Sequence, residues 1–243
     1  MPRRPPAAPA FTDWESGVIE ELVDEREPLT HEALAVLREV FPPHERQSLE
    51  RLAMEVAERR LRVRTVRDYH MLISRTETGR GMGMAAGVYL GAANAGLVTY
   101  LAVRPEYRAE RLGRGLRRRL VQCFREDARQ TGHADLGWVV GEVRMDNPWL
   151  ERLVRDRGAI PFDFTYYHPG VGPGWSEDRW VLYRQSLADE RLEVSAGEVR
   201  RLVYAIWRRA YRIGWPLEHD GFKAMMAELE GRSVVGVHPE LTG

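Results

Sequence analysis

The chain has 243 residues, of which 44% are hydrophobic and 30% are charged, so it is long enough for one large globular domain or for a domain with an appendage. Its 36 basic and 36 acidic side chains balance, so no overall field attracts nucleic acid or an acidic membrane. Cys123 is the single cysteine, which excludes an internal disulfide and a cysteine-rich zinc site.

The first ten residues, "MPRRPPAAPA", are basic and proline-rich, and we expect residues 1–15 to form a disordered lead into the folded chain. This segment lacks the unbroken apolar core of a secretory signal. No apolar run of about 18 residues, the length that spans a bilayer, occurs anywhere in the sequence. These features predict a cytoplasmic protein with no membrane partner.

Two helices are predicted before the first long strands. Thr30 can cap the first helix, and the Pro42-Pro43 pair ends it. The apolar stripes are Leu34, Leu37 and Phe41 in the first helix, and Leu49, Leu52, Ala53 and Val56 in the second.

Three strands are predicted next, over residues 69–76, 82–91 and 95–103. The connections "TETGRG" and "GAANAG" contain the glycines that hairpin turns need. We therefore expect these strands to be antiparallel neighbours.

The period of the apolar residues then changes from two to four. Leu112, Leu116, Leu120 and Phe124 form one helical stripe, and Gly132 is placed to end the helix. A strand over 134–143 follows. A crossover of this length predicts parallel pairing between the 95–103 and 134–143 strands.

A further helix and two more strands are predicted after residue 143. Asn147 is the expected cap, Pro148 the first helical residue and Gly158 the stop. Strands are predicted over 160–167 and 179–185. The whole pattern predicts an α/β fold of the α+β type, with a mixed sheet and helices on both sides.

The stretch "VRPEYRAERLGRGL" (103–116) lies between a predicted strand and a predicted helix. The first amides of a helix have no intrahelical acceptor and lie at the positive end of the helix dipole, so anions bind there. Gly113 and Gly115 would let a phosphate approach the backbone, and Arg108, Arg111 and Arg114 could add positive charge. The alternative is a solvated basic helix face with two incidental glycines.

This stretch resembles the acyl-CoA signature of the GNAT (GCN5-related N-acetyltransferase) superfamily, in which a strand ending in valine leads to Arg/Gln-x-x-Gly-x-Gly/Ala. The likeness rests on the strand, the Pro-Glu-Tyr-Arg approach and the two glycines. Glu110 stands where the family usually has Arg or Gln, and Arg111 replaces a frequent glycine. "EVFPPHERQ" and "NPWLERLVRDRGA" resemble further family segments, so the resemblance spans about 18–187. It implies a GNAT acyl-CoA N-acyltransferase domain over 16–187.

The resemblance also implies the residues that bind the cosubstrate acetyl-CoA. In the family, two parallel strands splay apart and expose backbone groups that bind the pantetheine arm, and a backbone amide faces the thioester oxygen. The implied acetyl-CoA-binding residues are Leu101, Ala102, Val103, Arg108, Arg111, Leu112, Gly113, Arg114, Gly115 and Asn147. The family's tyrosine, usually the acid that protonates the thiolate, aligns with Val154.

Acyl transfer to an amine needs a base for the amine and positioning of the thioester. Glu142 is the first candidate base because it lies near the end of the apolar strand "WVVGEV"; a salt bridge to Arg144 is the alternative interpretation. Glu45 is the second candidate. Tyr167 is the candidate acid, with Tyr166, Tyr100 and water as alternatives, and Trp149 and Trp175 would shape an acceptor pocket. The seven histidines show no metal-ligand spacing, so no metal is expected.

A C-terminal helical extension is predicted over 188–243. Ser195 and Glu198 form a capping box. The apolar face that follows consists of Val199, Leu202, Val203, Ile206, Trp207 and Ala210. This face must be buried, either on its own domain or across a homodimer.

The sequence therefore predicts a bacterial-like N-acetyltransferase that moves an acetyl group from acetyl-CoA to a small amine or peptide amine by direct attack on the thioester. One alternative is a catalytically reduced domain that binds or senses CoA. Another is a nucleic-acid binder, although its arginines would circle a helix rather than form one stripe. The arginines of this alternative are Arg104, Arg108, Arg111, Arg114, Arg117, Arg118 and Arg119.

Overall fold

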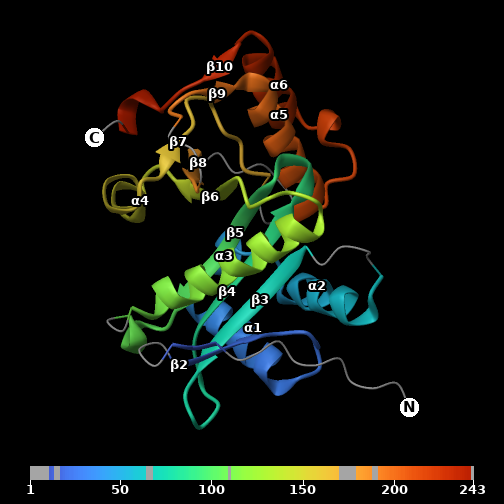
Figure 1. Ribbon diagram of the computed structural model, residues 1–243, viewed down its shortest axis with the longest axis vertical. Coiled ribbons are helices and arrows are strands. Elements are labelled where there is room, and N and C mark those ends of the chain that lie inside the picture. Colours follow the sequence, from blue (N-terminus) through green and yellow to red (C-terminus); the bar gives the residue numbers. More distant parts are fainter. Residues whose placement is uncertain are drawn as a thin grey trace. The chain divides into compact units, whose positions relative to one another are not determined.

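The computed structural model describes residues 11–13, 17–63, 68–108, 111–169, 179–187 and 191–241. The chain forms two compact units, the first made of 1–87 and 100–123 and the second of 88–99 and 124–243. Strands β4 (Gly81–Leu90) and β5 (Ala95–Val103) and helix α3 (Leu112–Gln130) pass from one unit to the other (Figure 1). Within the described ranges, no helix is both long and apolar enough to cross a bilayer.

The sheet of the first unit has the strand order β1-β2-β3-β4-β5 (Figure 1). Strand β2 (Gly17–Glu21) pairs antiparallel with β1 (Phe11–Asp13) on one side and with β3 (Tyr69–Arg75) on the other. The strands predicted over 69–76, 82–91 and 95–103 are confirmed within one residue at each end. The short β1 and β2 were not predicted, because their segments show no clear alternation.

Two helices of the first unit precede β3. They are α1 (Pro28–Val40) and α2 (Leu49–Leu61), as the apolar stripes predicted. The prediction that Thr30 caps α1 is wrong: α1 begins at Pro28, whose fixed φ suits the first turn, and the Thr30 hydroxyl donates to the Asp24 carbonyl at 2.7 Å. In α2 the cap is Ser48, whose hydroxyl accepts from the Arg51 amide.

Helix α3 packs closely on β4 in the first unit. A Cβ atom on Gly83 would lie 2.8 Å from the Ala102 carbonyl oxygen and 3.1 Å from Leu116 Cδ1, so only glycine fits there. Leu112, Leu116 and Leu120 are buried, which confirms the predicted helical stripe.

The sheet of the second unit has the strand order β4-β5-β6-β8-β7 (Figure 1). Strand β6 (Trp138–Arg144) pairs parallel with β5, from Ala95↔Trp138 to Val98↔Gly141, which confirms the predicted crossover. The parallel ladder ends at Gly141. Strand β8 (Trp180–Ser186) pairs antiparallel along the whole of β6.

The strand predicted over 160–167 is wrong for most of its length. Within this range only β7 (Ile160–Pro161) is a regular strand paired with β8, although the Phe162 amide also donates to the Leu182 carbonyl and Tyr166 forms an isolated bridge with Trp180 of β8. Phe162 then forms an isolated bridge with Val237, and the Asp163 amide donates to the Gly236 carbonyl. The C-terminal segment therefore takes the hydrogen bonds that a longer strand would have used. The helix before it, α4 (Trp149–Arg157), ends at Gly158 with φ of 60°, as predicted.

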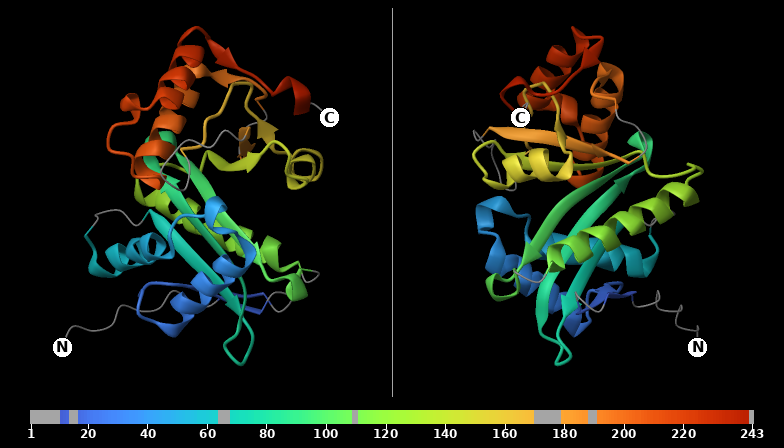
Figure 2. Two further views of the ribbon diagram at one scale, coloured as in Figure 1. Left: turned by 180° about the vertical axis from the view of Figure 1, so that it is seen from behind. Right: turned by 60° about the vertical axis from the view of Figure 1, so that its left-hand side comes forward.

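The C-terminal extension folds onto the second unit. It contains α5 (Ala196–Ala205), a π-helical turn η4 (Ile206–Ala210), α6 (Asp220–Glu230) and the short pair β9 (Val194–Ser195) and β10 (Val234–Val235). Both hydrogen bonds of the predicted capping box at Ser195 and Glu198 are present. Helix α5 lies against α6 (Figure 2) and also packs on the 3-10 turn Gly91–Ala93. The side chains of its predicted apolar face are buried. Residues of the same chain cover this face. Of the two possibilities left open by the sequence, burial on its own domain or across a homodimer, the structure has the first.

Candidate functional site

The connection between β5 and α3, in the first unit, has an unusual backbone. Arg111 precedes the first residue of α3 and has φ of 55°, a left-handed conformation that costs a non-glycine residue about 1 kcal/mol. The Arg111 carbonyl accepts from the Arg114 amide at 2.9 Å and from the Gly115 amide at 3.3 Å. Among the described residues, no acceptor lies within hydrogen-bonding distance of the Leu112 and Gly113 amides. Glu110 lies outside the described residues.

Gly113 leaves room beside this backbone. A Cβ atom there would lie 3.7 Å from Val103 Cγ2 and 4.0 Å from Leu101 Cδ2, which is ordinary van der Waals contact. Its φ is not left-handed either, so neither packing nor conformation requires glycine. The missing side chain instead keeps the first-turn amides open to an approaching anion. Leu101 and Val103 are half-buried, whereas Ala102, Leu112 and Gly115 are buried.

The arginines of this connection have different environments. Arg108, Arg111 and Arg114 are exposed, and Arg108 Nε lies 3.3 Å from the Val103 carbonyl, to which it donates. Arg104 is 5% exposed and is held by Glu39 through two hydrogen bonds of 2.6 and 2.9 Å, by Glu32 at 2.9 Å and by the Gly81 carbonyl. Arg104 therefore anchors the connection to α1, and its charge is already compensated.

Two further candidates of the first unit lie near α1. The Tyr100 hydroxyl is buried and accepts from the Gln47 amide at 2.8 Å, and its ring packs edge-on against Phe41. Glu45 ends the 3-10 turn η1 (Pro43–Glu45), is half-exposed, and lies 3.7 Å from His44 Nε2.

Glu142, in the second unit, is the centre of a buried polar cluster. Its side chain is 6% exposed, although it ends an otherwise apolar part of β6. One carboxylate oxygen accepts from the Tyr166 hydroxyl, and the other accepts from the Tyr211 hydroxyl at 2.5 Å. His168 Nε2 lies 2.6 Å from the Tyr211 hydroxyl and 3.9 Å from the carboxylate. We call Glu142, Tyr166, His168 and Tyr211 the Glu142 cluster.

Burial shifts the pKa of two residues in the Glu142 cluster, Tyr166 and His168. It raises the pKa of the Tyr166 phenol well above its ordinary value, and the Glu142 charge adds to this shift. Burial also lowers the pKa of His168, although the Glu142 charge opposes it. The His168 ring stacks on Trp180 with a centroid distance of 4.2 Å, which fixes its plane. At neutral pH the Tyr166 hydroxyl is therefore a donor, and His168 is neutral.

The other predicted site residues of the second unit lie outside this cluster. Tyr167 is 38% exposed, and its amide lies 3.4 Å from Met225 Sδ. The exposed Asn147 caps α4, because its side-chain oxygen accepts from the Trp149 amide at 2.9 Å. Val154 packs with Leu150 and Leu153, as an apolar helix residue does. Trp175 lies outside the described residues.

The sequence did not identify His168 and Tyr211 as members of a site. His168 follows two tyrosines in a loop, and Tyr211 follows an apolar helix, so each resembles an ordinary packing residue. Only the fold brings them to Glu142, which is 26 and 69 positions away along the chain.

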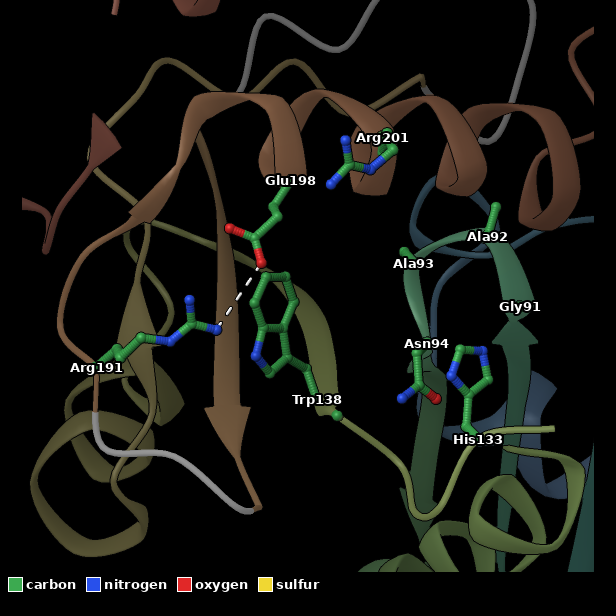
Figure 3. Close-up of a pocket in the computed structure, with 10 residues that line it drawn as sticks. Gly91, Ala92, Ala93, Asn94, His133, Trp138, Arg191, Glu198 and Arg201 are labelled. Carbon is green, nitrogen blue, oxygen red and sulfur yellow. Dashed lines mark ion pairs between the residues drawn. The ribbon is translucent and has the colours of Figure 1, made fainter. Parts of the chain in front are cut away.

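A separate cavity of about 320 Å³ lies within the second unit. Figure 3 shows Glu198 and Arg201 projecting from α5, with Trp138 below them and His133 and Asn94 on the other side. Glu198 lies 3.8 Å from Arg191 and also accepts from the capping residue Ser195. The cavity contains none of the predicted site residues.

One group of possible metal donors occurs in the described part of the chain: Glu21, His70 and Cys123, whose donor atoms lie within 4.8 Å of one another. The Arg59 guanidinium contacts Glu21 and lies 3.4 Å from His70 Nδ1. Its fixed positive charge would repel a metal ion, so this group fits a buried ion-pair network better than a metal site.

A comparison with solved structures finds proteins of similar fold. No protein-family model matches the sequence, and no curated protein matches it. A GNAT-family protein from Bacteroides thetaiotaomicron is similar over 74% of this chain and 90% of its own, with 17% identity and a TM-score of 0.52. A GNAT-family protein from Desulfovibrio desulfuricans is similar over 70% and 98%, with 18% identity and a TM-score of 0.49. The ribosomal-protein-S18-alanine N-acetyltransferase of Escherichia coli is similar over 72% and 97%, with 19% identity and a TM-score of 0.46.

Proposed function

We propose that this chain, which has the GNAT acetyltransferase fold, transfers an acetyl group from acetyl-CoA to a small amine or a peptide amine. The observation that carries the proposal is the start of α3, where the Leu112 and Gly113 amides lack an acceptor among the described residues and Gly113 leaves the backbone open. A diphosphate is the group that such a turn binds best, because several amides and the helix dipole act on it together. The fold by itself does not establish this activity.

In this proposal the start of α3 binds the diphosphate of CoA. Its ligands are the backbone of Leu112, Gly113 and Gly115, assisted by the charges of the exposed Arg108, Arg111 and Arg114. Asn147 is the remaining proposed contact. These arginines replace the cation that is missing where Glu110 stands.

The chain's other contributions are positioning and proton removal. The backbone of Leu101, Ala102 and Val103 would hold the pantetheine arm, and an amide near Leu101 would face the thioester oxygen. The neutral amine attacks the carbonyl carbon, the carbon–sulfur bond breaks, and the proton of the amine is accepted by a base. We propose Glu142 as that base and keep Glu45 as the second candidate. Tyr167 stays the proposed acid for the thiolate, with its neighbour Tyr166 as the alternative.

The direct test follows free thiol release from acetyl-CoA with a panel of small amines and N-terminal peptides. Turnover with at least one amine, lost in Gly113→Asp, is the expected result. Binding of acetyl-CoA without turnover on any amine would favour the CoA-binding or sensing alternative.

The nucleic-acid alternative has less support than it had from sequence. Arg104, one of the arginines it counted, is buried and neutralised by two glutamates. DNA binding that weakens steeply with salt, together with no acetyl-CoA binding, would overturn the present proposal in favour of that alternative. Cytoplasmic location and a homodimer stay predictions; sedimentation of the purified chain tests the latter.

A further inference from the structure

Tyr211 belongs to the C-terminal extension, yet its hydroxyl lies 2.5 Å from Glu142. The sequence resemblance to GNAT proteins spans about residues 18–187, so Tyr211 lies outside it. We propose that Tyr211 is a positioning residue for Glu142 and that the extension is therefore part of the catalytic apparatus. This inference rests on the proposed function, in which Glu142 is the base.

The hydrogen-bond directions in the Glu142 cluster follow from chemistry. An ionised carboxylate only accepts, so the Tyr211 hydroxyl must donate its proton to Glu142. The Tyr211 oxygen then accepts from His168 Nε2 at 2.6 Å, which places the proton of the neutral ring on Nε2. The chain of donors runs from His168 through Tyr211 to Glu142. Because Tyr166 donates to the other oxygen, both oxygens of the carboxylate are held.

The backbone before Tyr211 provides an independent observation. Residues Ile206–Ala210 form a π-helical turn, and the Tyr211 amide donates to the Ile206 carbonyl, five residues back, at 3.2 Å. Such turns are rare and often occur at functional sites, since the extra residue rotates the next side chain relative to an α-helix. Here it sets the direction of Tyr211.

The π-helical turn is firmly anchored. Ile206 and Trp207 are fully buried, and Ala210 is 4% exposed. Tyr211 is therefore held by a packed element, which is what a residue needs in order to fix the orientation of another. The same packing means that Phe at position 211 can occupy the ring's place.

Tyr211→Phe removes the hydroxyl and retains the ring. We expect kcat to fall about tenfold to a hundredfold, because a hydrogen bond to a charged group is lost. KM for acetyl-CoA should change by less than about twofold.

Tyr204→Phe is the matched control, since Tyr204 lies on α5, is 48% exposed and stands outside the Glu142 cluster. Its kcat and its KM for acetyl-CoA should equal those of the wild type. A wild-type kcat for Tyr211→Phe would overturn the inference and leave the proposed function standing.

Two further measurements keep the inference testable if Tyr211→Phe folds poorly or no amine is found. His168→Gln retains an N–H donor toward Tyr211 and His168→Phe does not, so the first should keep more activity than the second; equal activity refutes the donor chain. Without any acceptor amine, the carboxyl carbon of Glu142 can be followed by NMR and assigned by its loss in Glu142→Gln. In Tyr211→Phe its chemical shift at neutral pH should differ from the wild-type value because one hydrogen bond to the carboxylate is lost, and an unchanged chemical shift overturns the inference independently of activity.

Discussion

Substitution of Gly113 separates binding from folding, because the structure predicts opposite effects on the two. Gly113→Ala adds a methyl group that would lie 3.7 Å from Val103 Cγ2, so it creates no clash. Replacing glycine by alanine within a helix stabilises it by about 0.5–1 kcal/mol. For a chain of this size we expect the melting temperature of the free protein to rise by about 1–4 °C.

The effect on acetyl-CoA binding has the opposite sign. The added methyl group occupies the space through which a phosphate would approach the amides, and in Gly113→Asp a carboxylate also repels it. Two unit charges about 4 Å apart near a protein surface repel by about 4 kcal/mol, and rotation of the side chain reduces this. We therefore expect Gly113→Asp to lose about 2–4 kcal/mol of binding, or about 30-fold to 1,000-fold in Kd.

Calorimetric titration and thermal shifts measure these effects together. At an acetyl-CoA concentration of about 100 times Kd, the wild type should gain about 2.7 kcal/mol of stability, and Gly113→Asp should gain little. Gly231 is a suitable control because a Cβ there meets only the Glu228 carbonyl at 3.9 Å; Gly231→Asp should bind as the wild type does. Wild-type affinity in Gly113→Asp would refute the phosphate assignment, and a lower melting temperature in Gly113→Ala would refute the claim of free space.

Other predictions concern the Glu142 cluster and the buried ion-pair network of Glu21, His70 and Arg59. Glu142→Gln should lower kcat by at least about a hundredfold, because an amide cannot accept the proton of the attacking amine; a wild-type rate would remove Glu142 from the mechanism. Burial lowers the pKa of His168, so below about pH 6.5 the unfolded state binds a proton that the folded state does not. The free energy of unfolding therefore decreases as the pH is lowered below this value. His168→Gln should flatten this slope in urea unfolding; an unchanged slope would contradict the assignment. Burial opposes ionisation of Glu21, but His70 and Arg59 outweigh it and hold its pKa below the ordinary value. Glu21→Gln should therefore destabilise the protein by about 2–4 kcal/mol at pH 7, and this difference should shrink below about pH 4, as unfolding at the two pH values would show.

Some errors of the sequence reading have identifiable physical causes. Thr30 matched the chemistry of a cap, but Pro28 starts α1 two residues earlier. Residues 160–167 matched the composition of a strand, but the C-terminal segment bonds to that backbone at Phe162 and Asp163. Both errors arise because a local pattern permits several partners and the remainder of the chain selects one.

Strands β3, β4, β5, β6 and β8, the parallel crossover and the start of α3 could be derived from the sequence alone. Strand and helix periods, glycine-containing turns and capping residues act over a few positions, so a local reading captures them. The resemblance to GNAT proteins rested on the same short range, since the turn around Gly113 is contiguous in the chain.

Only the tertiary structure shows which side chains form ion pairs and hydrogen bonds with one another. Arg104 looked like one of several exposed cations, and the fold buries it between Glu32 and Glu39. Glu142 acquires its partners from a loop and from the C-terminal extension, through hydrogen bonds that span 24 and 69 positions. Hydrogen bonds and ion pairs depend on distances of a few ångströms in space, and no period or spacing along the chain encodes such distances.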